Sequence, residues 1–264
     1  MGNVRLNSKG SISSQGPLLN DQPSEGGGFW DGAPMFTSLP GSVPEYDVLD
    51  LNMLTWPGPV AASAEPGVGG WYAEGDGTIV IDIREAAGPR PGLRIQTDTT
   101  DNNEAIVRQN GTPWKYVSGK RMWMYGELRS GDANDGEIIF GLIPDDANAD
   151  PIGTEPTTGF YFLKDEAATE FDFRCLNTSD SGADLVSGTL SDDTSIHVGF
   201  KVLASGAMEV YSGATVSGMV KKLTIAAGAA GLNTDNLQVV MGVKTGAADA
   251  DYLDVLRLYV AQER

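Results

Sequence analysis

The feature that most constrains the fold is a pair of closely spaced runs in which apolar residues alternate with other side chains. In the first run, Lys120–Arg129, three apolar residues share one face: Met122, Met124 and Leu128. In the second run, Glu137–Leu142, one face carries Ile138, Phe140 and Leu142, and Ile139 between them is also apolar. Period-two alternation is typical of β-strands, and strands that are apolar on both sides lie within covered sheets. The linker SGDANDG is rich in turn-forming residues, so the two runs are predicted to form a β-hairpin at the centre of a sandwich.

Similar runs recur along the chain at intervals of roughly ten residues, as in all-β sandwiches. Further strands are expected at Tyr46–Leu54, Gly77–Glu85, Leu93–Thr97, Ala105–Gln109, Gly159–Lys164, Glu170–Cys175, Ser195–Leu203, Ala207–Tyr211, Met219–Ile225, Leu237–Lys244 and Asp251–Val260. The short gap between Ser195–Leu203 and Ala207–Tyr211 predicts a second hairpin. The sequence shows no amphipathic helical pattern and no long repeat. It therefore predicts an all-β fold, an antiparallel two-sheet jelly-roll sandwich.

The N-terminal part of the chain has a different character. Residues 1 to 28 are polar and aperiodic and end in three glycines, and the following segment up to residue 45 is rich in proline and irregular. We expect residues 1–45 to form an extended arm and lead-in, and residues 46–264 to form the sandwich. The arm can be a plain terminus or a strap that orders on a neighbouring subunit. Its candidate partner contacts are its apolar residues: Leu6, Ile12, Leu18, Leu19, Phe29 and Trp30.

Charge limits the partners of this chain. Acidic residues outnumber basic ones by 36 to 18, which gives a formal charge of −18. A field of this sign repels phosphate backbones and anionic lipid, so we expect neither nucleic acid nor membrane as a partner. The N-terminus lacks the apolar run of a secretory signal, and no window has the apolar length of a membrane span, so synthesis in the cytoplasm is expected.

Catalytic chemistry has few candidate residues. His197 is the single histidine and Cys175 the single cysteine, which argues against a nucleophilic triad and a zinc site. Glu170 and Asp172 share a strand face, and one family of sandwich glycosidases uses the pattern Glu-x-Asp-x-x-Glu. Here Cys175 occupies the place of the second glutamate. The sequence therefore predicts no catalytic residues and no enzyme.

Two kinds of binding site are compatible with the sequence. Exposed aromatic rings could bind a glycan, and the candidates are Trp114, Tyr116, Trp123 and Tyr125, which the arm or a neighbouring subunit could equally cover. No cofactor is expected. Calcium is the alternative, because the loops Asp132–Asp135 and Asp145–Asp150 offer oxygen ligands, although neither has the twelve-residue calcium-loop pattern.

Seven segments resemble the concanavalin-like, laminin-G-like jelly-roll proteins among the virion structural proteins of tailed bacteriophages. They are TDTTDNNEAIV (97–107), GKRMWMYGELR (119–129), IIFGL (138–142), GFYFLKDE (159–166), SIHVGFKV (195–202), MEVYSGATV (208–216) and DYLDVLRLYVAQER (251–264). The resemblance covers residues 75–264 and leaves the first 70 residues unmatched.

This resemblance implies a concanavalin-like sandwich that acts as a non-enzymatic virion protein. Such a protein would be a capsid decoration or cement protein, made in the host cytoplasm and located on the capsid surface. Its partners would be the major capsid protein and copies of itself in a homo-oligomer such as a trimer. A tail or fibre location is equally compatible. Two alternatives stay open: a glycan-binding adhesion module, and a divergent glycosidase that would depend on Glu170 or Asp172.

Overall fold

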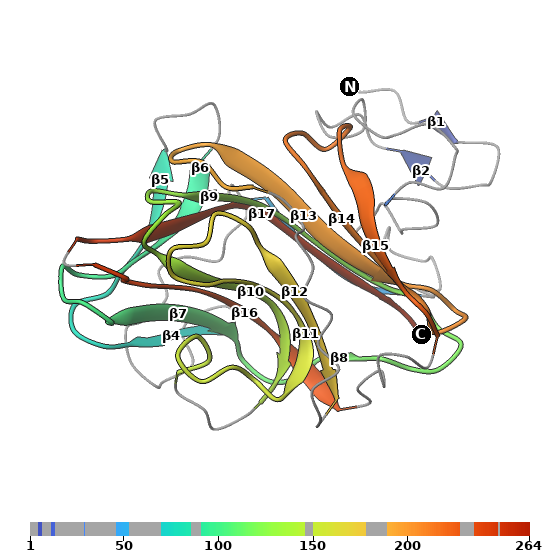
Figure 1. Ribbon diagram of the computed structural model, residues 1–264. Coiled ribbons are helices and arrows are strands. Elements are labelled where there is room, and N and C mark those ends of the chain that lie inside the picture. The colour runs from blue at the N-terminus through green and yellow to red at the C-terminus, as the bar shows by residue number, and fades with distance from the viewer. Residues whose placement is uncertain are drawn as a thin grey trace.

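The computed structural model describes residues 5–6, 12–13, 29, 46–52, 70–85, 91–145, 150–177, 189–227, 235–247 and 249–264. These residues form two large antiparallel sheets and one small two-stranded sheet, and none of them is helical (Figure 1). The predicted all-β, antiparallel two-sheet sandwich is confirmed. Within the described ranges, no helix is long and apolar enough to cross a membrane.

The larger sheet has eight strands. Its order is β15 (Val220–Ile225), β14 (Met208–Gly213), β13 (Ser195–Val202), β9 (Met122–Ser130), β17 (Tyr252–Glu263), β6 (Pro91–Gln96) and β5 (Val80–Glu85), and β3 (Tyr46–Asn52) also pairs with β17. β13 and β14 pair with each other, so the second predicted hairpin is confirmed.

The other large sheet has seven strands. Its order is β12 (Asp172–Asn177), β11 (Thr158–Lys164), β10 (Glu137–Pro144), β16 (Asn236–Lys244), β7 (Glu104–Gln109) and β4 (Trp71–Gly75), and β8 (Trp114–Lys115) pairs with β16. The small sheet pairs β1 (Arg5–Leu6) with β2 (Ile12–Ser13). The sequence pattern did not predict β4, β8 or the small sheet.

The prediction that residues 120–142 form a β-hairpin is wrong. β9 pairs with β13 and β17, whereas β10 pairs with β11 and β16, so the turn between β9 and β10 passes from one sheet to the other. The two strands face each other across the core. A Cβ atom on Gly126 would lie 2.4 Å from the Phe140 ring. Both runs do form strands, but their apolar faces bury each other rather than share one side of a sheet.

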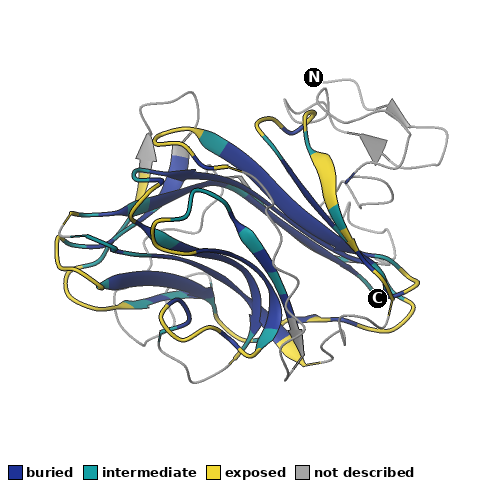
Figure 2. Cartoon of the chain, viewed as in Figure 1, coloured by how far each residue is buried: buried dark blue, intermediate teal, exposed yellow. Residues whose placement is uncertain are grey.

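The main core lies between the two large sheets, where the buried positions of the central strands meet (Figure 2). From β13 it contains Ile196, Val198, Phe200 and Val202, as the alternation predicts. β17 keeps its inward face in spite of a change in register between Val255 and Arg257, because Leu256 is an extra residue at that point. This β-bulge explains the irregular apolar pattern of the last strand.

The seven-stranded sheet is also covered on its outer face. A second buried cluster there consists of Ile106, Ile139, Ile143, Ile152, Tyr161, Leu163 and Val240. Ile152 comes from the connection between β10 and β11, and the Tyr161 hydroxyl donates to the Pro156 carbonyl oxygen at 2.9 Å. This connection therefore packs on the sheet, which explains why β10 is apolar on both sides.

Candidate functional site

The outer face of the eight-stranded sheet carries a buried aromatic cluster. It comprises Phe29, Trp123, Tyr125, Tyr211, Val216, Tyr259 and Ala261. The Phe29 ring lies 5.5 Å from that of Tyr211, edge to face, and 6.1 Å from that of Tyr125. Gly199 makes room for it, because a Cβ atom there would lie 2.8 Å from the Phe29 ring.

The four aromatic residues predicted to contact a glycan are all buried. Trp123 and Tyr125 are members of this outer cluster, and Trp114 and Tyr116 belong to the main core. The indole Nε1 of Trp114 donates to Gln109 Oε1 at 2.8 Å. Because no ring among the four is exposed, the expectation that they form a stacking surface for a sugar is wrong. The alternative was that the arm or a neighbouring subunit covers these rings; Phe29 packs on Tyr125, whereas Trp114 and Tyr116 are buried in the main core.

The predicted partner contacts have different outcomes. Phe29 is almost fully buried against its own sheet, so it is not an exposed anchor for another subunit. Leu6 and Ile12 lie on β1 and β2, which pair with each other. Leu18, Leu19 and Trp30 lie outside the described residues, as do the side chains of Leu6 and Ile12.

The few residues with catalytic potential occupy structural positions. The Tyr125 hydroxyl and His197 Nδ1 share a hydrogen bond of 2.7 Å on the buried outer face. Cys175 is a free, buried thiol in the core, and burial raises its pKa to about 12. Asp172 Oδ2 lies 3.5 Å from Arg174 Nη2, and Glu170 forms an isolated backbone bridge with Thr189. No nucleophile and base come together among these residues.

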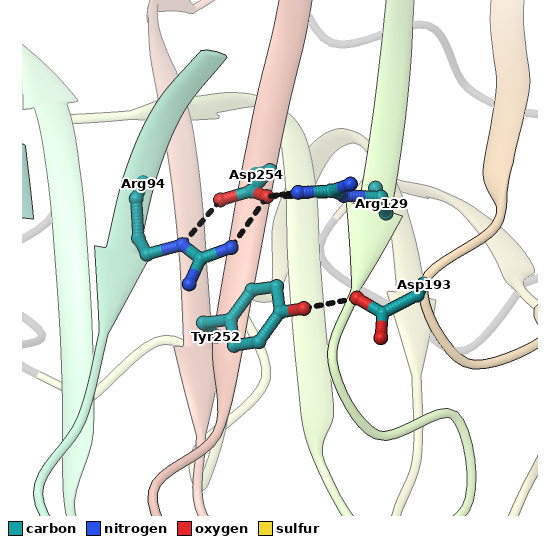
Figure 3. Close-up of polar contacts among 5 residues, drawn as sticks. All are labelled: Arg94, Arg129, Asp193, Tyr252 and Asp254. Carbon is teal, nitrogen blue, oxygen red and sulfur yellow. Dashed lines mark hydrogen bonds and ion pairs between the residues drawn. The ribbon is translucent and has the colours of Figure 1, made fainter. Parts of the chain in front are cut away.

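A network of charged side chains lies on the outer face of the eight-stranded sheet (Figure 3). Asp254 on β17 stands directly opposite Arg94 on β6 and Arg129 on β9. Arg94 Nε and Nη2 donate to the two oxygens of Asp254 at 2.7 and 2.8 Å, and both Nε and Nη2 of Arg129 donate to Asp254 Oδ2. Hydrogen bonding to Asp254 raises the pKa of Arg94.

Tyr252 extends the same network. The Arg94 guanidinium carbon lies 3.5 Å from the centre of the Tyr252 ring, and the Tyr252 hydroxyl donates to Asp193. Bidentate pairs and stacked guanidinium groups fix geometry strongly. Since Asp254 is buried and its oxygens accept from both arginines, we assign this network to holding β6, β17 and β9 in register, not to binding a ligand.

The two acidic loops considered for calcium differ in what the structure describes. Residues 146–149 of the loop Asp145–Asp150 lie outside the described residues. The loop Asp132–Asp135 is described, and Asp132 Oδ1 accepts from the backbone nitrogens of Asn134 and Asp135 at 2.8 and 3.1 Å. In the described part of the chain, no three acidic, histidine or cysteine side chains are arranged to hold a metal ion.

A cluster of polar side chains on the outer face of the seven-stranded sheet is partly exposed to solvent. We call it the Tyr72 patch, and it consists of Tyr72, Glu74, Arg108, Gln238 and Asp145. Trp71 and Ala73 of β4 are buried in the core, and Tyr72 and Glu74 are half-buried on the opposite face of the strand. Asp145 follows β10 and is exposed, whereas Arg108 and Gln238 are buried beneath the others.

Register brings the members of the Tyr72 patch together. Tyr72 pairs with Arg108 on β7, which pairs with Val240 on β16 two residues from Gln238. Arg108 Nε forms an ion pair with Glu74, whose side chain is 27% exposed. Gln238 Nε2 lies 3.4 Å from Asp145 Oδ1 and 3.5 Å from the Pro144 carbonyl oxygen.

Burial and neighbouring carboxylates set the electrostatics of the Tyr72 patch. Burial raises the pKa of Tyr72, and Glu74 and Asp145 raise it further against the opposing effects of Arg108 and Gln238. Burial also raises the pKa of Glu74, while Arg108 lowers it. The patch therefore presents a half-exposed phenol ring beside two hydrogen-bond-accepting carboxyl groups. Sequence reasoning missed these residues, although Trp71–Gly75 alternates inward and outward as a strand does.

No protein-family model and no curated protein sequence matches this chain. Several solved structures are similar to it in fold. Peanut lectin matches with a TM-score of 0.56 and 12% identity, over 83% of this chain and 98% of the lectin. Arcelin-5, a lectin-like defence protein from Phaseolus vulgaris, matches with a TM-score of 0.53 and 11% identity, over 83% and 99% of the two chains. A protein of unknown function from Shewanella oneidensis MR-1 matches with a TM-score of 0.51 and 11% identity, over 83% and 86%.

These matches define the class of fold. The chain adopts the concanavalin-like jelly-roll sandwich that legume lectins share, with the two sheets in the same general arrangement. At this level of identity the likeness shows the fold alone, because one sandwich can carry different functions. These matches do not show a virion role, so the virion assignment stays a proposal.

Proposed function

We propose that this protein is a non-enzymatic glycan-binding module and that the Tyr72 patch is its contact with the sugar. Lectins and lectin-like proteins with the same fold support the class of function. The observation that carries the proposal is the half-exposed Tyr72 ring beside Glu74 and Asp145, above buried Arg108 and Gln238.

The chemistry of the patch suits a sugar. An aromatic ring offers a flat apolar surface for the C–H groups of a pyranose, and ionised carboxylates accept strong hydrogen bonds from hydroxyl groups. Arg108 is buried and paired with Glu74, so the carboxylate is held in place before a ligand arrives. Such preorganisation lowers the entropic cost of binding. His197 and Cys175 hold structural positions, and the proposal assigns binding rather than turnover to the patch.

A glycan array followed by calorimetry tests this proposal. The wild-type protein should bind at least one glycan, and Glu74→Gln should weaken that binding by about 10- to 150-fold, since a hydrogen bond to a charged group contributes about 1.5–3 kcal/mol. Tyr72→Ala should also weaken binding, and Tyr72→Phe, which keeps the ring, should weaken it less. Glu166→Gln is the matched control, because Glu166 is exposed and lies away from the patch. Binding that survives both Tyr72→Ala and Glu74→Gln would rule out the Tyr72 patch as the site, and a wild-type protein that binds no glycan would rule out the function.

A second candidate is the virion component that the sequence resemblance implies, with the major capsid protein and further copies of the chain as partners. One observation favours it. Phe29, which directly follows residues 1–28 in the sequence, is buried on the outer face of the eight-stranded sheet. Those residues include Leu6, Ile12, Leu18 and Leu19, which could contact a capsid lattice. Many weak contacts on a lattice give strong attachment.

Purified particles test the second candidate. Immunogold labelling with antibody against the sandwich, together with mass spectrometry of the particles, should find the protein on the head. A variant lacking residues 1–28 should fail to bind. Absence of the protein from the particles by both methods would exclude a virion role, and full binding by the truncated variant would exclude the strap.

A further inference from the structure

Lys164 is a fully buried lysine at the end of β11. Its Nζ donates to the carbonyl oxygens of Gly136 and Asp165, the latter at 3.2 Å. Lys164 pairs with Ile138 at the start of β10, so its ammonium group lies beside the turn that joins β9 to β10. A buried ammonium group is costly unless several acceptors surround it.

Acidic side chains face this lysine from the β9–β10 turn, from the first residue of β10 and from the residue before β17. Asp132 and Asp135 come from the β9–β10 turn, Glu137 begins β10, and Asp251 precedes β17. Asp165 and Glu166 follow β11 and act on Glu137, and Lys244 at the end of β16 stands opposite Glu137. Carboxylates together with backbone carbonyl oxygens are the ligands that calcium prefers.

The residues do not fit a calcium ion at the loop Asp132–Asp135. Asp132 Oδ1 accepts from two backbone nitrogens of the turn, and the Asp132 carbonyl oxygen accepts from Ser130 Oγ at 2.8 Å. The Gly136 carbonyl oxygen accepts from Lys164. A divalent ion would have to displace the ammonium group and the hydrogen bonds that shape the turn.

We infer that the Lys164 ammonium group compensates the negative charge of these acidic connections, so that they keep their shape without a divalent metal ion. Lys164 donates to the β9–β10 turn and to the first residue of the β11–β12 connection, and its charge interacts with that of Asp251, the residue before β17. The inference does not depend on which ligand the protein binds.

The charges around Lys164 make this inference testable by pH. Burial and the carboxylates of Asp132 and Asp135 raise the pKa of Asp251 to about 6, and Lys164 opposes that rise. At pH 8 Asp251 is ionised and needs a nearby cation. At pH 5 it is mostly protonated, and the need is smaller. Burial lowers the pKa of Lys164 itself, and the four carboxylates oppose this effect.

The experiment compares Lys164→Met with Lys222→Met by thermal unfolding at pH 8 and pH 5. Lys222 is exposed on β15, so its substitution makes the same change in net charge at an open site. Lys164→Met should lower the Tm at pH 8 by about 6 °C or more and at pH 5 by a smaller amount, because Asp251, one of the carboxylates that face Lys164, is then mostly uncharged. Lys222→Met should change the Tm by about 1 °C or less at either pH.

A calcium titration of the wild-type protein provides the second measurement. After treatment with EDTA, addition of millimolar calcium should leave the Tm of the wild-type protein unchanged. A saturable rise in Tm with calcium would overturn the inference, even if Lys164→Met failed to fold. An equal loss of Tm at pH 5 and pH 8 would also overturn it, because the stabilisation by Lys164 would then not depend on the charge of Asp251.

Discussion

Replacing Asp254 by Asn should destabilise the sandwich strongly, because it removes the only carboxylate in contact with both Arg94 and Arg129 in the described structure. The side chains of Arg94, Arg129 and Asp254 are 12%, 9% and 1% exposed. Exposed ion pairs contribute about 0–1 kcal/mol, whereas removing one partner of a buried pair costs about 3–5 kcal/mol. The burial of this network places it in the second class. We therefore expect a loss of about 3–5 kcal/mol in the free energy of unfolding.

Urea unfolding followed by tryptophan fluorescence measures this loss. Asp101→Asn is the matched control, since Asp101 is exposed and should contribute less than about 0.5 kcal/mol. The double variant Asp254→Asn with Arg129→Met should recover part of the loss, because it removes one of the two guanidinium groups left without a carboxylate. A loss below about 1 kcal/mol for Asp254→Asn would refute the reasoning, because the network would then behave as a surface ion pair.

Three further predictions concern other buried groups. Burial and the neighbouring Asp150 raise the pKa of Glu104 to about 9. The stabilisation from its protonated form is therefore complete below the unfolded pKa near 4.5 and is lost as the pH rises through 9. In urea unfolding at a series of pH values, Glu104→Gln should remove up to about 1.4 kcal/mol per pH unit from the dependence of the free energy of unfolding on pH between these two values. Cys175, with its pKa near 12, should not react with a thiol reagent at pH 8 until the protein is unfolded, and rapid labelling of the native protein would show that the thiol is accessible. Phe29→Ala should lower the free energy of unfolding in urea by about 3 kcal/mol. Gly199→Ala should destabilise the wild-type protein more than it destabilises the Phe29→Ala variant, because the added methyl group meets the Phe29 ring only in the wild type. Equal effects would mean that Phe29 does not occupy the space above Gly199.

Local alternation was sufficient to predict most strands of the sandwich. In β13 and β16 every second residue is apolar and enters the main core, so the sequence shows both the strand and its buried face. The lateral partners of a strand are not visible in this way. β9 and β10 were assigned to one hairpin because they are adjacent in the chain, whereas the partners of β9 are β13 and the C-terminal β17. Alternation gives the direction of side chains, and pairing depends on segments far apart in the sequence.

The candidate site was less predictable for the same reason. Aromatic residues at alternate positions suggested a sugar-binding face, but Trp123 and Tyr125 are buried under Phe29 and residues of two other strands. The Tyr72 patch depends on the register of β4, β7 and β16, which brings Arg108 and Gln238 beneath Tyr72. Only the outward positions of Tyr72 and Glu74 could have been inferred from the sequence.

The distribution of charge narrows the kind of glycan that the Tyr72 patch could accept. Two buried cations elsewhere in the sandwich have carboxylate partners: Lys201 pairs with Glu209 at 3.0 Å, and Arg129 pairs with Asp254. The patch itself has two carboxyl groups, Glu74 and Asp145, against one guanidinium group, Arg108. Since the whole chain carries a formal charge of −18, a uronic or sialic acid would meet like charge both at a distance and at the patch. Neutral or amino sugars should therefore bind more tightly than acidic ones, and added salt should reduce this difference because it screens the repulsion.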